Sequence, residues 1–144
     1  LMAKRNRWRT KEAVRIAEQA GIKALRTGAE AILTEAIDET PIETGTLRRS
    51  GTVTVGGLPD GAQVYEAAEA GTEMKDAFSK EAGKEKAVYI SYNTPYARRQ
   101  HEELDWEHPL GGKAKYLEDS FNRLKKKVVK MAELRIKKAL RDAK

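Results

Sequence analysis

The sequence predicts an α+β fold in which a small, mainly antiparallel sheet of three or four strands packs against a long N-terminal helix and a long C-terminal helix. Apolar residues recur at helical spacing over residues 11–38 and again over 113–143. Between these stretches lie short segments rich in β-branched side chains, which are typical of strands. A chain of 144 residues can bury one core, so we expect a single domain, 1–144.

The first predicted helix runs from Lys11 to about Asp38. Its apolar stripe follows i, i+3, i+4 spacing and consists of Ile22, Leu25, Ala29, Ile32 and Ala36. A basic N-terminal arm, residues 1–10, precedes it, and Thr10 is the expected N-cap because its hydroxyl can accept a hydrogen bond from an unpaired amide. Pro41 ends the helix, since the residue before a proline avoids the helical region.

Three segments in the middle of the chain are predicted strands. Residues 52–55 alternate threonine and valine, and residues 62–67 are expected to pair with them as an antiparallel strand. The strongest strand pattern is at 87–93, where one face carries Val88, Ile90 and Tyr92. The segment 68–86, rich in Glu, Lys, Ala and Gly, is expected to be an exposed loop.

The last predicted helix spans residues 113–143 and follows a short helix at 96–103 and a loop at 104–112. Its apolar stripe is expected to pack on the sheet and consists of Leu117, Phe121, Leu124, Val128 and Met131. Ile136 no longer lies on this line. We therefore expect the end of the helix, residues 134–144, to project and contact a neighbouring molecule.

Composition and charge narrow the class of protein. The net charge is +6 and 35% of the residues are charged, which is compatible with nucleic acid or an acidic protein surface as a neighbour. The chain has no cysteine, which suits synthesis in a reducing cytosol. It has no long apolar stretch, so no signal peptide, membrane span or membrane partner is expected.

The candidate catalytic and metal-binding patterns are weak. The residues with metal-ligand chemistry are His101, Glu102, Glu103, Asp105 and His108, but their spacing matches no zinc signature, and a solvated loop is the preferred interpretation. No serine lies in a G-x-S-x-G elbow, and no glycine pair has the frame of a phosphate loop. We therefore expect a protein without catalytic residues, metal or cofactor.

The basic residues suggest two kinds of surface. One face of the last helix could follow nucleic-acid phosphates and carries Arg123, Lys125, Lys126, Lys127 and Lys130. A solvated helix face, or a face that meets an acidic neighbouring subunit, would explain the same pattern. The candidate residues for contacts between subunits are Arg48, Arg49, Tyr96, Arg98, Arg99, Trp106, Lys137, Lys138 and Arg141.

Two strings of residues carry a family resemblance. The first runs from Pro41 to Ser50 (PIETGTLRRS) and resembles the P-x-x-T-G-x-L-R-x-S element of a neck or tail-component family of long-tailed phages. The second begins with Thr94–His101 (TPYARRQH), continues with His108-Pro109 and ends with GKAKYLE at 112–118. It is similar to a minor capsid protein family of phages that infect Gram-positive bacteria.

The resemblance implies a structural protein of the phage virion, made in the host cytoplasm and placed at the neck between head and tail. Its expected partners are copies of itself in a ring, or attached to one, and other neck proteins of the head-completion and tail-terminator type. Non-specific contact with DNA is left open. No catalytic residues are implied. Two other functions remain open: a nucleic-acid-binding module that uses the last helix, and a metal-dependent hydrolase at the His101–His108 loop.

Overall fold

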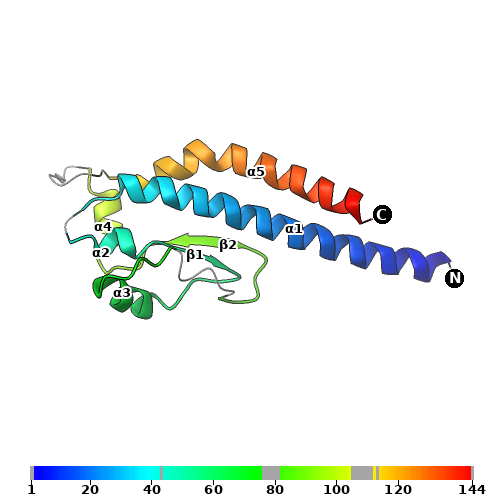
Figure 1. The fold of residues 1–144 in the computed structure, drawn as a ribbon, viewed down its shortest axis with the longest axis horizontal. Helices are drawn as coiled ribbons and strands as arrows, with labels where there is room; N and C mark the ends of the chain where they lie inside the picture. The colour runs from blue at the N-terminus through cyan, green and yellow to red at the C-terminus, as the bar shows by residue number, and fades with distance from the viewer. Residues whose placement is uncertain (1, 43, 76–81, 105–111, 113, 144) are drawn as a thin grey trace.

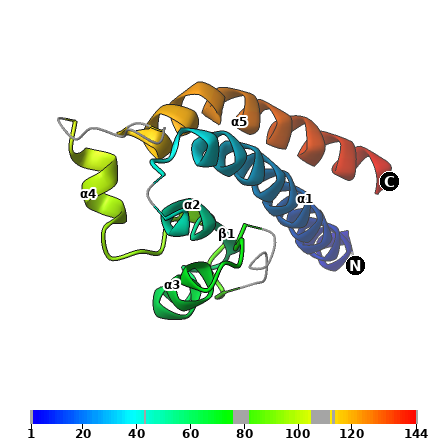
Figure 2. The same cartoon turned by 60° about the vertical axis from the view of Figure 1, so that its left-hand side comes forward.

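The computed structural model describes residues 2–42, 44–75, 82–104, 112 and 114–143, without the side chains of residues 2–8 and 98. The elements follow the chain in this order: α1 (Met2–Glu39), α2 (Thr46–Arg49), β1 (Thr52–Val55), α3 (Gly61–Glu69), β2 (Val88–Ser91), α4 (Ala97–Glu102) and α5 (Tyr116–Asp142). Figure 1 shows an elongated molecule in which α1 runs along the whole length. The helix α5 lies on one side of α1, and the two strands lie on the other (Figures 1 and 2).

The first helix begins earlier than its sequence pattern suggested. α1 starts at Met2, so Thr10 lies inside the helix and the predicted N-cap at that residue is wrong. The first 20 residues contain no proline or glycine, and the lysines, arginines and alanines among them favour a helix. The predicted end is confirmed, because α1 stops two residues before Pro41.

The sheet has two antiparallel strands among the described residues, not the three or four expected. β1 pairs with β2 in a register that places Val53 opposite Ile90 and Thr52 opposite Ser91. The predicted strands at 52–55 and 87–93 are therefore confirmed in type. Val88, Ile90 and Tyr92 pack against the core formed with α1, as the alternation at 87–93 predicted.

The predicted strand at 62–67 is instead part of the helix α3. The carboxylate of Asp60 accepts hydrogen bonds from the backbone amides of Ala62 and Gln63, which caps the first turn. Val64 and Ala68 are buried at i, i+4 spacing, so the helix buries one face. The alanines in this segment have the highest helix propensity of any residue, which favours the helix together with the cap and the buried face.

The helix α5 packs chiefly along α1, whereas the sequence pattern predicted packing on the sheet. Gly28 of α1 lies directly against the side chain of Val128. Further along the helix, a Cβ atom at Gly21 would lie 3.2 Å from Cδ1 of Ile136. We expected residues 134–144 to project, but α5 still contacts α1 at Ile136, because glycines allow the two helices to approach closely.

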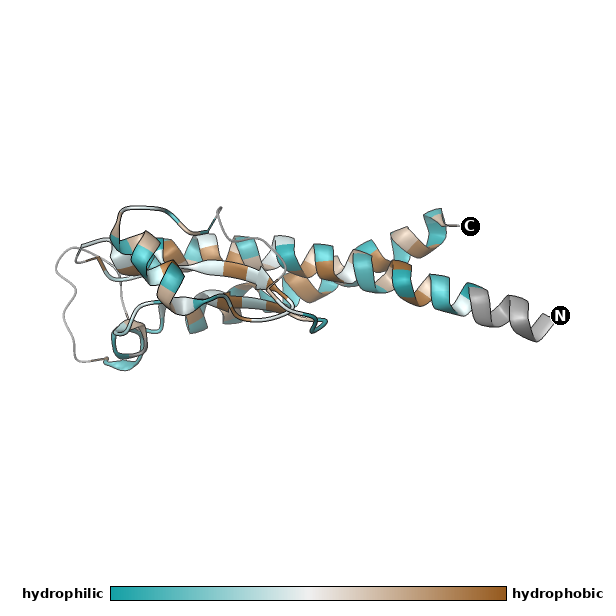
Figure 3. Cartoon of the chain, turned by 90° about the horizontal axis from the view of Figure 1, so that it is seen from below, coloured by the Kyte–Doolittle hydropathy of each residue, from teal (hydrophilic) through white to brown (hydrophobic). Residues whose placement is uncertain are grey.

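Figure 3 shows hydrophobic and hydrophilic residues mixed along the coloured parts of both long helices, and the buried apolar residues among those described form separate clusters along the molecule. One cluster joins α1 to the sheet through Ala29, Leu33 and Val53. A second cluster lies at the end of the molecule where α1 stops and α5 begins, and a third lies under α3. This arrangement leaves the outer side of α5 and the outer side of α3 to solvent.

Candidate functional site

The two sequence strings that carry the family resemblance meet at one end of the molecule. Leu47 from the first string and Ala97 from the second pack with Tyr116 at the start of α5. The ring of Tyr92 meets the ring of Tyr116 edge to face, with centroids 4.9 Å apart. The Tyr116 hydroxyl donates a 2.9 Å hydrogen bond to the Ala97 carbonyl. We call this cluster the junction, because it joins α1, α2, α4 and α5.

Buried polar groups fix the geometry of the junction. The Tyr92 hydroxyl lies 2.8 Å from the Thr40 hydroxyl, which in turn contacts the Ala36 carbonyl at 2.6 Å. Burial raises the pKa of Tyr92 above its ordinary value, although the Thr40 hydrogen bond opposes this change. Nearby, the side-chain amide of Asn93 donates to the Ser50 carbonyl at 2.9 Å. The paired groups indicate a structural role for these residues.

The arginine doublet of the first string is held by hydrogen bonds within the chain. Arg48 donates to the Thr40 carbonyl at 2.7 Å and to the Asp38 carbonyl at 3.0 Å, so its guanidinium group satisfies the last carbonyls of α1. Arg49 donates to the Ala68 carbonyl at 2.8 Å, near the end of α3. The contribution of either arginine to a subunit contact stays a prediction.

The glycine of the same string adopts a backbone conformation that favours glycine over other residues. Gly45 has φ +84°, a backbone conformation that residues with a Cβ atom rarely adopt. It precedes the single turn of α2, and the Arg49 amide donates to its carbonyl at 3.0 Å. The sequence element P-x-x-T-G-x-L-R-x-S is thus a tight joint after a long helix, with a buried leucine and an arginine cap.

The candidate metal cluster is only partly covered by the structure, because Asp105 and His108 lie outside the described residues. His101 contacts Glu102 through Nδ1 at 2.8 Å and accepts a 3.2 Å hydrogen bond from the Glu118 amide through Nε2. Its ring meets Tyr116 edge to face. Among the described residues there is no group of three or more potential metal ligands. Here His101 serves as a link between α4 and α5.

A salt bridge beside this histidine strengthens the same link. Lys115, at the N-cap of α5, pairs with Glu102 and with Glu118. Hydrogen bonds, first from Lys115 and then from His101, lower the pKa of Glu102 below its ordinary value. A general acid would need the opposite shift at neutral pH, so this carboxylate is not tuned for proton donation.

The other candidate contact residues occupy varied positions. Tyr96 is half-buried against the junction, as expected for an aromatic ring that fills a pocket. Arg99 is exposed on α4, the side chain of Arg98 is not described, and Trp106 lies outside the described residues. Lys137, Lys138 and Arg141 are exposed on α5. These assignments to subunit contacts stay predictions.

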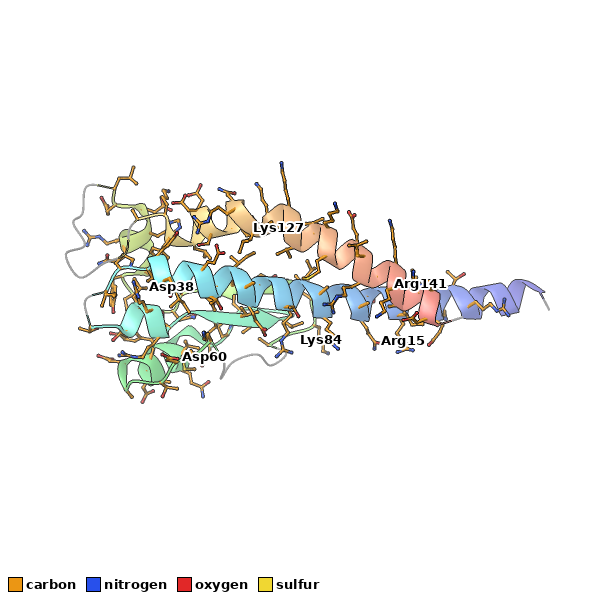
Figure 4. All side chains as sticks on the ribbon, turned by 45° about the horizontal axis from the view of Figure 1, so that its top comes forward. Arg15, Asp38, Asp60, Lys84, Lys127 and Arg141 are labelled. Atoms are coloured by element: carbon orange, nitrogen blue, oxygen red, sulfur yellow. The ribbon has the colours of Figure 1, made fainter. Side chains whose placement is uncertain are left out.

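The predicted nucleic-acid face divides into two parts. Arg123 turns toward α1, where it donates to Glu39 at 2.9 Å and to Glu35 at 3.4 Å. The exposed part is formed by Lys125, Lys126, Lys127 and Lys130. Figure 4 labels Lys127 and Arg141 on α5 and Asp60 at α3. Sequence reasoning therefore identified most of this face but missed that Arg123 ties α5 to α1.

Two open grooves lie on the described surface. One, of about 400 Å³, has a mainly apolar lining that includes Val88, Ile90, Leu117 and Phe121. The other, of about 550 Å³, lies between α1 and residues 83–86. Neither brings together a nucleophile and a base, so in the described part of the chain the arrangement supports packing and contact rather than a reaction.

The described helices do not meet the requirements of a membrane span. None of them is both long enough and apolar enough to cross a bilayer. Even α1, the longest described helix, carries charged residues along its length.

Comparisons with known proteins gave one clear match. Residues 9–119 match the model of a protein family described as "Bacteriophage HK97-gp10, putative tail-component". A search of curated proteins and a search of solved structures each found no significant match. The matched region runs from the first turns of α1 to the first turn of α5, so it includes the whole junction.

Proposed function

The chain belongs to the bacteriophage HK97-gp10 family of tail components, and on this premise we propose that it joins the phage head to the tail. It acts in the virion neck as part of a ring, or as subunits attached to one. Its role is structural, and its partners are other copies of the chain and neck proteins of the head-completion and tail-terminator type.

The observation that carries this proposal is the junction. Residues of both strings pack together where α2, α4 and α5 meet, and Arg48 of the first string and Tyr116 of the second donate hydrogen bonds to backbone carbonyls at the end of α1 and in α4. No catalytic arrangement occupies this place among the described residues. A rigid end with a long two-helix extension offers large outer surfaces to neighbouring proteins, which suits a connector.

The experiment uses phage particles. A phage that cannot make this protein should yield filled heads and free tails but few joined particles, and supplying the protein in trans should restore joining. Counting joined particles by electron microscopy, with mass spectrometry of purified virions, measures both the role and the location. Normal numbers of tailed particles without the protein, or virions that lack it, would contradict the proposal.

A second candidate, binding of nucleic acid through α5, is favoured by the exposed cations Lys125, Lys126, Lys127 and Lys130. Binding of this kind depends steeply on salt, because each phosphate contact releases counterions. Titration of the full chain with duplex DNA at two salt concentrations tests it. Affinity that does not change with salt, or with these lysines replaced by glutamine, would rule out this candidate.

A further inference from the structure

The positive charge of this protein is concentrated in two places. Residues 122–143, which include most of α5, contain nine basic and two acidic side chains, a net charge of +7, and residues 1–11 contain five basic side chains and no acidic one. The whole chain has a net charge of +6, so the remaining residues are acidic overall. Residues 57–74, which include α3, contain four acidic side chains and no basic one. The molecule thus carries an acidic region at α3 in addition to the basic region along α5.

The basic region presents a continuous outer face. Lys126, Lys130, Lys137 and Arg141 are exposed and recur at helical spacing, so they lie opposite the residues of α5 that contact α1. Lys126, Lys130 and Lys137 form no ion pair with another described residue. Leu134 stands among them with 59% of its surface exposed. We call these five residues the α5 face.

The acidic region also presents one outer face. Glu66 and Glu69 are exposed on the side of α3 opposite the buried Val64 and Ala68, and Glu73 is exposed just beyond the helix. Asp60, which caps α3, and Leu58, which is 62% exposed, precede this helix. None of the three glutamates forms an ion pair with another described residue. We call Glu66, Glu69 and Glu73 the α3 face.

The two faces cannot neutralise each other within one molecule. Both views of the ribbon place α5 and α3 on opposite sides of α1 (Figures 1 and 2), and Asp60 lies across the molecule from Lys127 in Figure 4. A contact between the α5 face of one copy and the α3 face of the next would be heterologous. Such contacts leave one face free at each end, so they continue into rings or filaments.

We infer that the α5 face binds the α3 face of a second copy of this chain; the inference rests on the proposed ring-forming role and names its surfaces. The charges are complementary, which steers the two copies together and sets their orientation. The α5 face also exposes Leu134, and Leu58 is exposed shortly before α3. Burial of these leucines against the apolar surface of a protein partner is favourable, whereas a row of phosphates presents no apolar surface to them.

The test uses charge reversal in the full chain and sedimentation of the purified proteins. One variant carries Lys126→Glu, Lys130→Glu and Lys137→Glu; the other carries Glu66→Lys, Glu69→Lys and Glu73→Lys. Self-association of the wild type at low ionic strength should fall at least tenfold in either variant alone. An equimolar mixture of the two should associate again, because each variant then supplies the face that the other needs.

A matched control separates this effect from a change in net charge. Lys11, Lys23 and Lys84 are also exposed lysines, and replacing them with glutamate alters the net charge by the same amount as the α5 variant. This control should associate like the wild type. Circular dichroism spectra of all variants verify that each one folds, and association of the wild type should weaken as salt is added.

Three outcomes would overturn the inference: a wild type that stays monomeric at low ionic strength, variants that associate normally, or a mixture that does not recover. Loss of duplex DNA binding in the α5 variant, with unchanged sedimentation, would assign the face to phosphates instead. These results are independent of the joining assay. Normal tailed particles in the absence of the protein would refute the neck function, whatever the sedimentation shows.

Discussion

Replacing Gly28 with alanine tests the close packing of α1 on α5. A Cβ atom at this position would lie 2.4 Å from Cγ1 and 2.7 Å from Cγ2 of Val128. Both distances are far below ordinary contact, and the branched valine has little freedom to move aside within a helix. The two helices would therefore have to separate, so we expect Gly28→Ala to destabilise the protein.

Two effects of opposite sign set the size of this loss. Alanine in place of glycine favours a helix by about 1 kcal/mol, whereas overpacking costs roughly 1–3 kcal/mol. The clash involves both methyl groups of Val128, so we take the upper part of that range and expect a net loss of about 1–2 kcal/mol. With an unfolding entropy of about 2.1 cal/mol/K per residue and 144 residues, this lowers Tm by roughly 3–7 °C.

Thermal unfolding followed by circular dichroism measures this change, and the chain offers a matched control. At Gly21 the nearest atom to an added Cβ is the flexible end of Ile136, at 3.2 Å, so Gly21→Ala should leave Tm unchanged or raise it. Adding Val128→Ala to Gly28→Ala should cost less than the two separate losses together. A Gly28→Ala protein as stable as the wild type, or strictly additive losses, would refute this account of the helix contact.

Three further predictions follow from the same contacts. Arg48→Met should lose about 1–2 kcal/mol in urea unfolding, because two carbonyls at the end of α1 lose their donor; an unchanged midpoint would show that water replaces the guanidinium group. Truncation after Leu134 should lower Tm, since it removes the contact of Ile136 with α1; an unchanged Tm would show that the end of α5 contributes nothing to the fold. Stability should be complete below about pH 10 and should fall as the pH rises toward the raised pKa of Tyr92; Tyr92→Phe should reduce this alkaline loss, and an equal loss in the variant would assign it to other groups.

Where the local pattern was strong, the sequence alone was sufficient to predict the element. The threonine–valine alternation at 52–55 and the alternation at 87–93 both correspond to strands, because successive side chains of a strand point to opposite faces with a period of two. The two long helices were equally clear from their apolar stripes. The turn at Gly45 likewise has a local cause, since glycine tolerates a positive φ at no steric cost.

Where the pattern was ambiguous, capping and burial in the folded chain decided the element. The segment at 62–67 is short and rich in alanine, so it fits a strand or a helix, and the Asp60 cap with the burial of Val64 and Ala68 selected the helix. The tertiary structure also decided which element each apolar stripe packs against. The residues of α5 specify an apolar side, but the glycines of α1 determine that this side meets another helix.

The residues of the candidate site also divide into features that the sequence predicts and features that only the folded structure decides. From the sequence we could identify charged residues, their number and their spacing, and hence the basic face of α5. The sequence could not distinguish cations turned outward from those engaged by the chain itself: Lys126 is exposed, whereas Arg48 caps α1 and Arg123 pairs with two glutamates of α1. The physical reason is that a long cationic side chain takes whichever acceptors the fold brings within reach, and their positions exist only once α1, α2 and α5 have packed together.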